Sequence, residues 1–343
     1  MGWEAMSRND APSGGRTRLS DVAAAAGVSA MTVSRALREP QRLNPQTLER
    51  IRAKISELGY LPNGSARSLA SKRSRIVAAV VPTLSFSVYA GTLQGLSDGL
   101  RGAGFELMLG DSGYDTRNER SLVEAFIARG VDALVLTGVE HDPGTRDLVS
   151  AHGLPIAEIW DVARDPLGIC IGFSNRSAGR AVGALLASLG RRHWAFIGSR
   201  GEHRSRKRME GFRHAAEVAG LPRPVDVLVQ NAMMIDQARD AARRLLRPGR
   251  RIDAVLCAND LLACGLLQVA RESGRRVPEE TAVVGFGDFD IASIATPALT
   301  TVRIPGYRMG LVAAEALLSK VAGRAGVQKS IDLGYEIVRR ETA

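Results

Sequence analysis

Apolar residues in the segment 18–37 recur three or four positions apart, the spacing of an amphipathic helix, with one interruption. The positions that the first helix would bury are Leu19, Val22, Ala23 and Ala26. Ser20 can cap this helix, with Asp21 beside its positive N-terminal end, and Gly27 supplies the turn. Ser29 can cap a second helix that starts at once. Two short helices around a tight turn predict a helix-turn-helix, whose second helix presents its N-terminal residues to base edges in the major groove.

A third helix is predicted directly after this pair. Asn44 is a favourable N-cap, Pro45 a favourable first residue, and Gly59 a stop signal. Its apolar face would consist of Leu48, Ile51, Ile55 and Leu58. Three helices around one core predict an all-α DNA-binding headpiece over residues 18–62. The segment 63–74 is too short to form a stable helix alone in water, so we expect a hinge helix and linker that fold on a partner helix and DNA.

From residue 75 onward, short apolar runs alternate with amphipathic helices. Nine runs have the composition of strands: 76–81, 105–109, 133–136, 155–159, 169–173, 195–197, 225–229, 254–257 and 281–286. Continuous apolar strands between helices indicate parallel sheets that are covered on both faces. Nine strands are too many for one ordinary sheet. We therefore predict a two-lobed α/β sensor domain over residues 75–343, with two doubly wound parallel sheets and a ligand cleft where their strand ends face each other.

The net charge of the 343 residues is +10, and residues 1–74 hold +6 of it, with 12 Lys and Arg against 6 Asp and Glu. Concentrated positive charge suits a phosphate backbone, although an ordinary basic surface would give the same charge. Cys170, Cys257 and Cys264 lack the spacing of a metal site or a redox pair, so we expect buried free thiols in a reducing cytoplasm. Residues 1–17 lack the pattern of a secretion signal and are expected to be a disordered tail, and no stretch approaches the length of a membrane span.

Several stretches carry a resemblance to a known family. They are Thr32-Val33-Ser34-Arg35-Ala36-Leu37, then Leu58-Gly59-Tyr60-Leu61-Pro62-Asn63, then Ala66 with Leu69. These residues resemble the headpiece of the lactose-repressor/galactose-repressor (LacI/GalR) family, and the similarity extends over residues 18–343. Three stretches are most similar to its gluconate-repressor branch: Met31-Thr32-Val33-Ser34-Arg35, Asp132-Ala133-Leu134-Val135-Leu136-Thr137, and Asp332-Leu333-Gly334-Tyr335-Glu336-Ile337-Val338. The resemblance implies a homodimer that binds double-stranded palindromic operator DNA, and a sensor with a periplasmic-binding-protein-like fold.

In that family the chain crosses three times between the two lobes of the sensor. By position the crossings are expected near residues 170–175, 301–306 and 329–332. The first lobe would then comprise about 75–172 and 306–328, and the second about 173–304 and 330–343. Three crossings make a hinge that can close on a ligand.

The resemblance also implies the DNA contacts. Ala30, Met31 and Arg35 would face base edges, and Arg35 could form two hydrogen bonds with a guanine. Contacts to phosphates, which set the register, would come from Ser20, Thr32, Ser34 and Asn44. The paired segments 63–70, with Asn63 and Ala66, would fold in the minor groove. There Leu69 would wedge into the central base step, unless it is only a linker residue.

Polar residues at the predicted strand ends are candidates for binding a ligand in the cleft. They are Asp161, Asn259 and Asp288. Arg208 matches the arginine that reaches the ligand in the family, and Tyr89 fits a residue of the first lobe that packs on the ligand. Each has a plainer alternative. Asn259 could be only a helix cap, the two aspartates surface carboxylates, the run 204–208 a solvated basic face, and Tyr89 an ordinary core residue.

Arginines and a lysine at one edge of the cleft favour an anionic ligand, because a guanidinium binds a carboxylate through two parallel hydrogen bonds. Asp and Asn side chains favour hydroxyl groups. A sugar acid such as gluconate has both. Gly287 stands where many family members carry an acidic residue, which lowers repulsion toward an acid and puts a direct copy of neutral-sugar recognition in doubt.

The function that the resemblance implies is a cytoplasmic repressor that a small-molecule effector releases from its operator. A corepressor that strengthens DNA binding stays an open alternative. A solute-binding receptor would need an export signal and would have no use for a headpiece. An enzyme is disfavoured because the chain has no phosphate-binding glycine loop, no nucleophile elbow and no pairing among its five histidines. No catalytic residue, cofactor or metal is expected.

Overall fold

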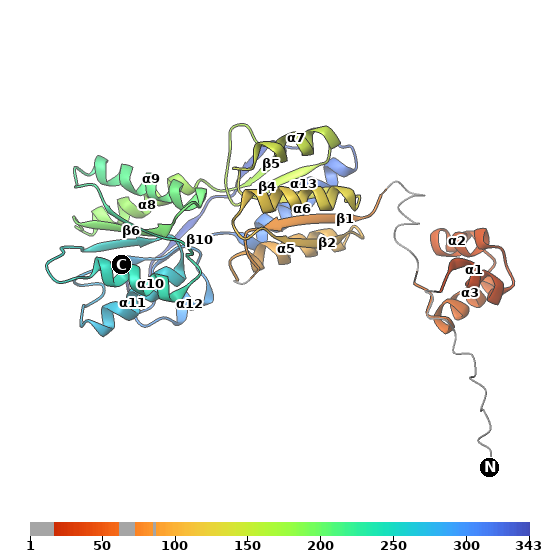
Figure 1. The fold of residues 1–343 in the computed structure, drawn as a ribbon, viewed down its shortest axis with the longest axis horizontal. Coiled ribbons are helices and arrows are strands. Elements are labelled where there is room, and N and C mark those ends of the chain that lie inside the picture. Colours follow the sequence, from red (N-terminus) through yellow and green to blue (C-terminus); the bar gives the residue numbers. More distant parts are fainter. Residues whose placement is uncertain (1–16, 62–72, 85–86) are drawn as a thin grey trace, which may run out of the picture. The chain divides into compact units, whose positions relative to one another are not determined.

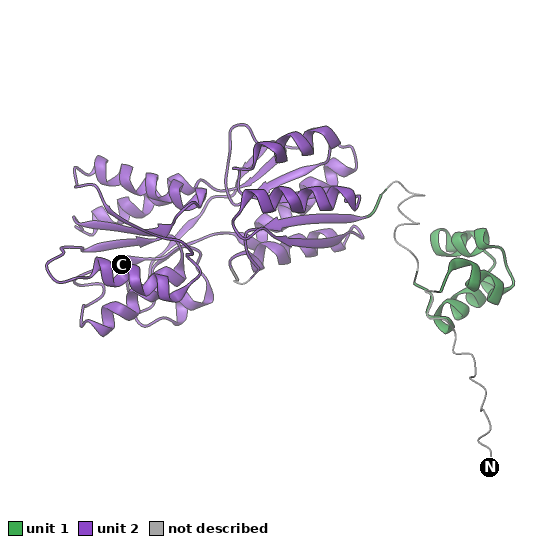
Figure 2. Cartoon of the chain, viewed as in Figure 1, with its two compact units in different colours: residues 1–74 green, residues 75–343 purple. Residues whose placement is uncertain are grey.

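The chain divides into two compact units, residues 1–74 and 75–343 (Figure 2). The computed structural model describes residues 17–61, 73–84 and 87–343. The described helices of the first unit are α1 (Leu19–Ala26), α2 (Ala30–Arg38), the 3-10 helix η1 (Pro40–Arg42) and α3 (Pro45–Glu57). Val22, Val33 and Ile51, one from each α-helix, are fully buried and form the centre of a small core. The predicted helical headpiece is confirmed.

The caps of α2 and α3 are those that the sequence predicted. Ser29 Oγ accepts a hydrogen bond from the N–H three residues later at 3.2 Å, and Asn44 Oδ1 accepts one from the N–H two residues later at 3.0 Å. The prediction that Ser20 caps α1 was wrong. The N-cap is Arg18, whose N–H donates to the Asp21 carboxylate at 2.7 Å, and Ser20 lies inside the first turn. The Asp21 carboxylate, at the third position of the helix, accepts the hydrogen bond of the Arg18 backbone N–H, so the helix starts two residues earlier than predicted.

The second unit contains two parallel sheets (Figure 1). The larger has the strand order β11-β5-β4-β3-β1-β2. Its strands are β1 (Ile76–Val81), β2 (Glu106–Asp111), β3 (Ala133–Thr137), β4 (Ile156–Ile159), β5 (Ile169–Gly172) and β11 (Ser330–Asp332). The smaller, with the order β7-β6-β8-β9, consists of β6 (Trp194–Ser199), β7 (Val225–Val229), β8 (Ala254–Cys257) and β9 (Ala282–Val284). These sheets are the centres of lobe 1 and lobe 2, which confirms the predicted fold class.

Helices cover both faces of the sheet in lobe 1. On one face lie α5 (Ala90–Arg101), which follows the short η2 (Ser87–Tyr89), and α13 (Gly306–Val321); on the other lie α6 (Thr116–Ala128) and α7 (Pro143–His152). In strand β1, alternate residues pack into the cores on opposite faces of the sheet. Val77 and Ala79 belong to the core beneath α5 and α13, whereas Ala78 and Val80 belong to the core beneath α6 and α7. Because successive side chains of a strand point to opposite faces, a strand covered on both sides is apolar throughout.

The sheet of lobe 2 is covered in the same way. Its helices are α8 (Asn175–Ser188), α9 (His203–Val218), α10 (Ile235–Leu245), α11 (Asp260–Glu272) and the short α12 (Asp290–Ile294). Helices α8 and α9 approach so closely that a Cβ atom at Gly179 would lie 2.1 Å from the carbonyl oxygen of Arg208. Only glycine permits this contact, which places the backbone of α9 directly against α8.

The chain passes between the lobes three times. The first two crossings are at residues 173–174 and 304–305. The third was expected near 329–332, with residues from 330 onward in lobe 2, and this prediction was wrong. Strand β11 pairs with β5 in the sheet of lobe 1, so the chain crosses at residues 333–335. It then forms β12 (Glu336–Val338), which pairs antiparallel with β10 (Thr301–Arg303).

The three cysteines are free thiols, and they differ in burial. Cys170 and Cys257 are buried free thiols, as expected, while Cys264 is half-buried. Within the described ranges, none of the helices is both long and apolar enough to cross a membrane.

Candidate functional site

The solvent face of α2 carries the residues predicted to contact bases. Met31 exposes 69% of its surface, and Ala30 and Arg35 are exposed as well. Arg35 follows Met31 by four positions and therefore lies one turn further along the same face. Helix α2 contains no Asp or Glu, so a DNA duplex that approached this face would meet the Arg35 guanidinium and the apolar side chains of Ala30 and Met31.

The residues predicted to contact phosphates lie at the helix starts. The Thr32 hydroxyl is 2.9 Å from the Ser29 hydroxyl at the beginning of α2, and Ser34 is half-buried on the same helix. Ser20 and Asn44 are exposed at the first turn of α1 and the N-cap of α3. The predicted minor-groove residues Asn63, Ala66 and Leu69 lie outside the described residues.

Two adjoining cavities lie between the lobes of the second unit, with volumes of about 100 and 20 Å³. Tyr114, Glu202 and Arg204 line both of them. Tyr89 and Trp160 of lobe 1 face the smaller cavity together with Arg208 of lobe 2. These two cavities form the interlobe cleft that the sequence predicted.

Arg204 occupies the centre of the interlobe cleft. It lies in the first turn of α9, is 5% exposed, and donates a hydrogen bond from Nη2 to the Tyr89 hydroxyl at 2.6 Å. Its guanidinium carbon is 5.6 Å from the centre of the Tyr89 ring and 5.9 Å from that of Trp160. Burial opposes the charge of Arg204, but Tyr89 and Glu202, whose carboxylate is 3.3 Å away, outweigh it and raise the pKa of Arg204. The cleft therefore contains a permanent buried cation.

Arg208 follows one turn later on the same face of α9. Its Nε donates to Asn175 Oδ1 at 2.8 Å and its Nη1 to the Ala258 carbonyl at 2.6 Å. Its guanidinium carbon lies 3.8 Å from the centre of the Phe286 ring. Asn175 in turn donates from Nδ2 to the Trp160 carbonyl of lobe 1 at 3.0 Å. Burial lowers the pKa of Arg208 to about 10, so it is still a cation at neutral pH.

The rim of the larger cavity holds ion pairs between the lobes. Glu140 of lobe 1 accepts a hydrogen bond from Arg206 of α9 at 2.7 Å and also contacts His203. Burial lowers the pKa of His203 despite this neighbouring carboxylate. Deeper in lobe 1, His141 lies between two buried carboxylates, with Nδ1 2.7 Å from Glu119 Oε1 and Nε2 3.3 Å from Glu158 Oε1. Among the described residues, no group of three His, Cys, Asp or Glu side chains is arranged to hold a metal ion.

Comparison with known proteins assigns both units. The family profile described as "Bacterial regulatory proteins, lacI family" matches residues 18–63, and the one described as "Periplasmic binding protein-like domain" matches residues 184–343. The HTH-type transcriptional regulator GntR of Escherichia coli K12 is 33% identical over 322 residues, which are 94% of this chain and 97% of that protein. The GntR regulator of Pseudomonas aeruginosa is 35% identical over 329 residues, 96% of each chain. The chain belongs to the LacI family.

A solved structure agrees over both units of this LacI-family regulator. A LacI-family transcriptional regulator from Silicibacter pomeroyi is 28% identical, with a TM-score of 0.89 over 95% of this chain and 99% of that one. The protein is thus a DNA-binding transcriptional regulator with a ligand-binding domain. Its similarity to the two GntR regulators supports the gluconate-repressor branch that the sequence indicated.

Three of the five predicted ligand residues of the LacI-family regulator line the cleft, namely Tyr89, Arg208 and Asn259. Asn259 is also a helix cap. Its Oδ1 accepts from the Leu262 N–H at 2.8 Å and its Nδ2 donates to the Ala232 carbonyl at 3.1 Å. Asn259 therefore holds the start of α11 while its side chain borders the cleft.

The other two predicted residues are not brought into the cleft. The Asp288 carboxylate accepts hydrogen bonds from Arg303 Nε and Arg340 Nη2, each at 2.6 Å, beside the β10–β12 pair. Asp161 accepts from the Val162 N–H at 2.9 Å, and its Oδ2 is buried 3.7 Å from His203 Nε2. Neither carboxylate lines either cavity.

Sequence reasoning placed Arg204 only within the basic run 204–208 and did not single it out as a ligand residue, and it missed Glu202 and Tyr114. The signal for Arg204 was present, because it precedes Arg208 by four positions and shares its helix face. Tyr114 had no comparable signal. It follows β2 in a loop whose position depends on the sheet of lobe 1.

Proposed function

We propose that this regulator binds a palindromic operator as a homodimer and that a sugar acid of the gluconate type, held in the interlobe cleft, releases it. Arg204 and Arg208 carry this proposal, since they place two buried cations one turn apart in the cleft. Glu202 pairs with Arg204 and compensates one of the two charges. A neutral sugar would leave the other positive charge in the cleft, whereas a carboxylate neutralises it.

In this proposal Arg204 binds the ligand carboxylate, because its guanidinium borders both cavities. Arg208 has two of its nitrogens committed to Asn175 and Ala258, and it serves chiefly as the positive wall of the smaller cavity. The hydroxyl groups of the ligand would meet Tyr89, Tyr114 and Asn259, which offer both donors and acceptors.

Ligand entry requires the lobes to move apart, because cavities of about 100 and 20 Å³ are far smaller than the roughly 300–1,000 Å³ of typical ligand sites. The Tyr89–Arg204 hydrogen bond and the Glu140–Arg206 ion pair would break on opening and re-form on closure around the ligand. Closure about the three crossings would shift the lobes of the two protomers, so that their hinge helices no longer pack. A coupling free energy of about 1–3 kcal/mol between ligand binding and DNA binding is sufficient for such release.

The proposed homodimer uses an apolar groove on lobe 2. The groove lies between α11 and α12, has a volume of about 340 Å³, and is lined in part by Cys264, Leu267 and Ile291. Ile294 at its edge exposes 76% of its surface. A two-fold axis through this region would bury Ile294 of both protomers and match the symmetry of a palindrome. Because it acts on the chromosome, such a dimer works in the bacterial cytoplasm.

The decisive experiment is fluorescence anisotropy of the purified protein on a labelled palindromic operator from its own promoter, titrated with gluconate. We expect release at micromolar to millimolar gluconate. If gluconate instead strengthened operator binding, it would act as a corepressor rather than an inducer. An operator dissociation constant that does not change at saturating gluconate would rule out gluconate as the effector while leaving the DNA-binding role intact. Turnover of gluconate, checked in the same mixture, would indicate an enzyme.

A further inference from the structure

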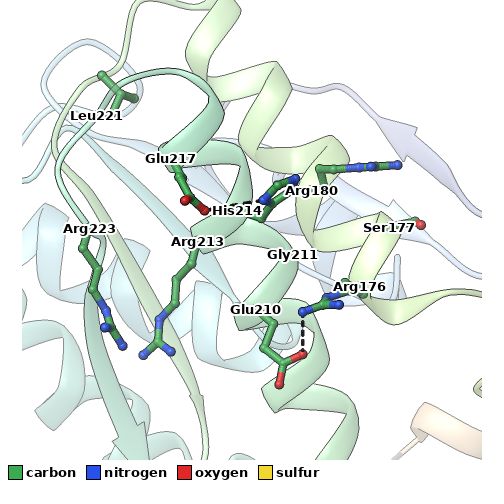
Figure 3. A pocket seen from close by; sticks show the side chains of 10 residues that line it. All are labelled: Arg176, Ser177, Arg180, Glu210, Gly211, Arg213, His214, Glu217, Leu221 and Arg223. Atoms are coloured by element: carbon green, nitrogen blue, oxygen red, sulfur yellow. Dashed lines mark ion pairs between the residues drawn. The ribbon is translucent and has the colours of Figure 1, made fainter.

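A wide groove of the second unit lies away from the interlobe cleft, on the outer side of α8 and α9. It has a volume of about 770 Å³ and contains four arginines, Arg176, Arg180, Arg213 and Arg223 (Figure 3). Arg176 is 3.3 Å from Glu210, and Arg213 pairs with Asp226 of β7. Arg213 and Arg223 point to the same side of the groove in Figure 3. The Arg213–Asp226 ion pair therefore links this groove to strand β7.

A second groove, of about 480 Å³, lies on the other side of the same strand. It contains Val225 and Asp226 of β7 together with Arg200, Arg244, Arg247 and Arg250. The two grooves meet at Asp226, which lines the second groove and pairs with an arginine of the first. Six of the eight arginines form no ion pair with any described residue: Arg180, Arg200, Arg223, Arg244, Arg247 and Arg250.

Strand β7 itself is the edge of the sheet. Within the described chain it pairs only with β6, so one row of its backbone N–H and C=O groups faces outward. Val225, Val227 and Leu228 are half-buried rather than covered. An open strand with apolar side chains and unneutralised arginines on both faces has the properties of a site for an added strand.

We propose that this arginine-flanked edge is a docking site for an extended acidic segment of a partner protein, which pairs with β7 as a further strand. Successive side chains of that segment point to opposite faces, so its carboxylates reach the arginines of both grooves. Duplex DNA fits less well. Its phosphates can accept hydrogen bonds but carry no N–H groups for the outward C=O groups of β7, whereas an extended peptide segment supplies both donors and acceptors.

The test uses the full chain and a fluorescein-labelled eight-residue peptide with the repeat Glu-Glu-Val-Val, which places carboxylates on both faces of an added strand. Unlabelled duplex DNA is present in excess so that the headpiece is occupied. We expect binding in fluorescence anisotropy. A peptide of the same sequence with alternate backbone amides N-methylated should bind at least about tenfold more weakly, because it keeps the charge but cannot complete the strand pairing. Equal affinity for the two peptides would overturn the pairing.

A double variant locates the peptide. Arg244→Glu with Arg247→Glu should weaken binding by at least about tenfold, since like charges then face each other. The matched control is Arg101→Glu with Arg129→Glu, which makes the same charge change at the ends of two helices of lobe 1 and should leave binding unchanged. If both double variants lost the same affinity for the peptide, or if the duplex displaced the peptide, the proposed docking site at β7 would be wrong.

Discussion

Arg204 Nη2 and Tyr89 Oη lie 2.6 Å apart, and this hydrogen bond joins lobe 2 to lobe 1 at the centre of the cleft. A charged donor in a buried site makes a stronger hydrogen bond than a neutral one. The contact therefore helps to hold the lobes together in the arrangement seen here, in which Tyr89 is 2% exposed.

Tyr89→Phe should weaken gluconate binding by about tenfold, because it removes the acceptor that Arg204 uses in the closed arrangement. The ring contact with Trp160, at 5.1 Å between centroids, is retained. Isothermal titration calorimetry measures the effect. Tyr307→Phe is the matched control, since its hydroxyl lies 3.3 Å from Asp98 within lobe 1 and outside the cleft. If the wild type, Tyr89→Phe and Tyr307→Phe bound gluconate with equal affinity, the Tyr89 hydroxyl would have no part in ligand binding.

Arg208→Ala should abolish the gluconate response and leave operator affinity within about twofold, because the headpiece is a separate unit. It should also lower the free energy of unfolding by roughly 2–4 kcal/mol, since Asn175 Oδ1 and the Ala258 carbonyl lose their donors and Phe286 loses its covering guanidinium. Operator release and urea unfolding test the two effects separately. A retained response would exclude Arg208 from the ligand site.

Much of the fold follows from local sequence patterns. Inner strands such as β1 and β3 are readable because a parallel strand covered on both faces is apolar throughout. Ser29 and Asn44 are readable as caps because each bonds to an N–H two or three residues away. Strand β11 escaped prediction because three residues carry too little periodicity, and its place is decided by pairing with β5, some 160 residues earlier.

The cleft was harder to predict than the fold. The rule that ligands bind at strand ends selected Asp288, but it could not foresee that Arg303 and Arg340 bind its carboxylate. Arg208 was found through a motif on one helix. Its neighbour Tyr89 comes from the other lobe, and the contact between Tyr89 and Arg204 depends on how the lobes meet, which no local pattern records.

His141 should make stability depend on pH. Burial alone would lower its pKa, but the contacts with Glu119 and Glu158 outweigh burial and raise the pKa to about 9. A pKa raised above the unfolded value of about 6.5 stabilises the fold below pH 6.5, and this contribution is lost as the pH rises toward 9. The difference in unfolding free energy between the wild type and His141→Gln should thus be roughly 3 kcal/mol at pH 6 and shrink by pH 9.

Urea unfolding at pH 6, 7.5 and 9 measures that difference. His152→Gln is the control, because His152 is exposed and its Nδ1 lies 2.9 Å from the Leu148 carbonyl of its own helix, away from the two buried carboxylates. If the His141→Gln difference were the same at all three pH values, the histidine would not be charged between the two carboxylates.

Leu69→Ala tests the wedge that the sequence predicts in the hinge segment. Loss of an apolar side chain between base pairs should weaken operator binding more than binding to unrelated duplex DNA, because only the kinked operator complex needs the wedge. Ser68→Ala, which removes only a hydroxyl group from the neighbouring residue, should leave the ratio of the two affinities unchanged. An equal loss on both DNAs would make Leu69 a linker residue.

Arg35→Ala should cost about 1–3 kcal/mol of operator binding and relax specificity at one base pair, since a guanidinium that bonds to two atoms of one guanine distinguishes it from other bases. Arg35 is exposed on α2 one turn after Met31, which leaves its guanidinium free to reach a base edge. Arg38→Ala on the same helix is the matched control. The Arg38 Nε donates to the Ser34 carbonyl at 3.3 Å and Arg38 is the last residue of α2, so we expect its guanidinium to contact DNA phosphates rather than a base edge. Anisotropy titrations on operators altered at single base pairs measure both variants. Arg38→Ala should weaken all operators alike, and a uniform loss for Arg35→Ala too would place Arg35 on a phosphate rather than a base.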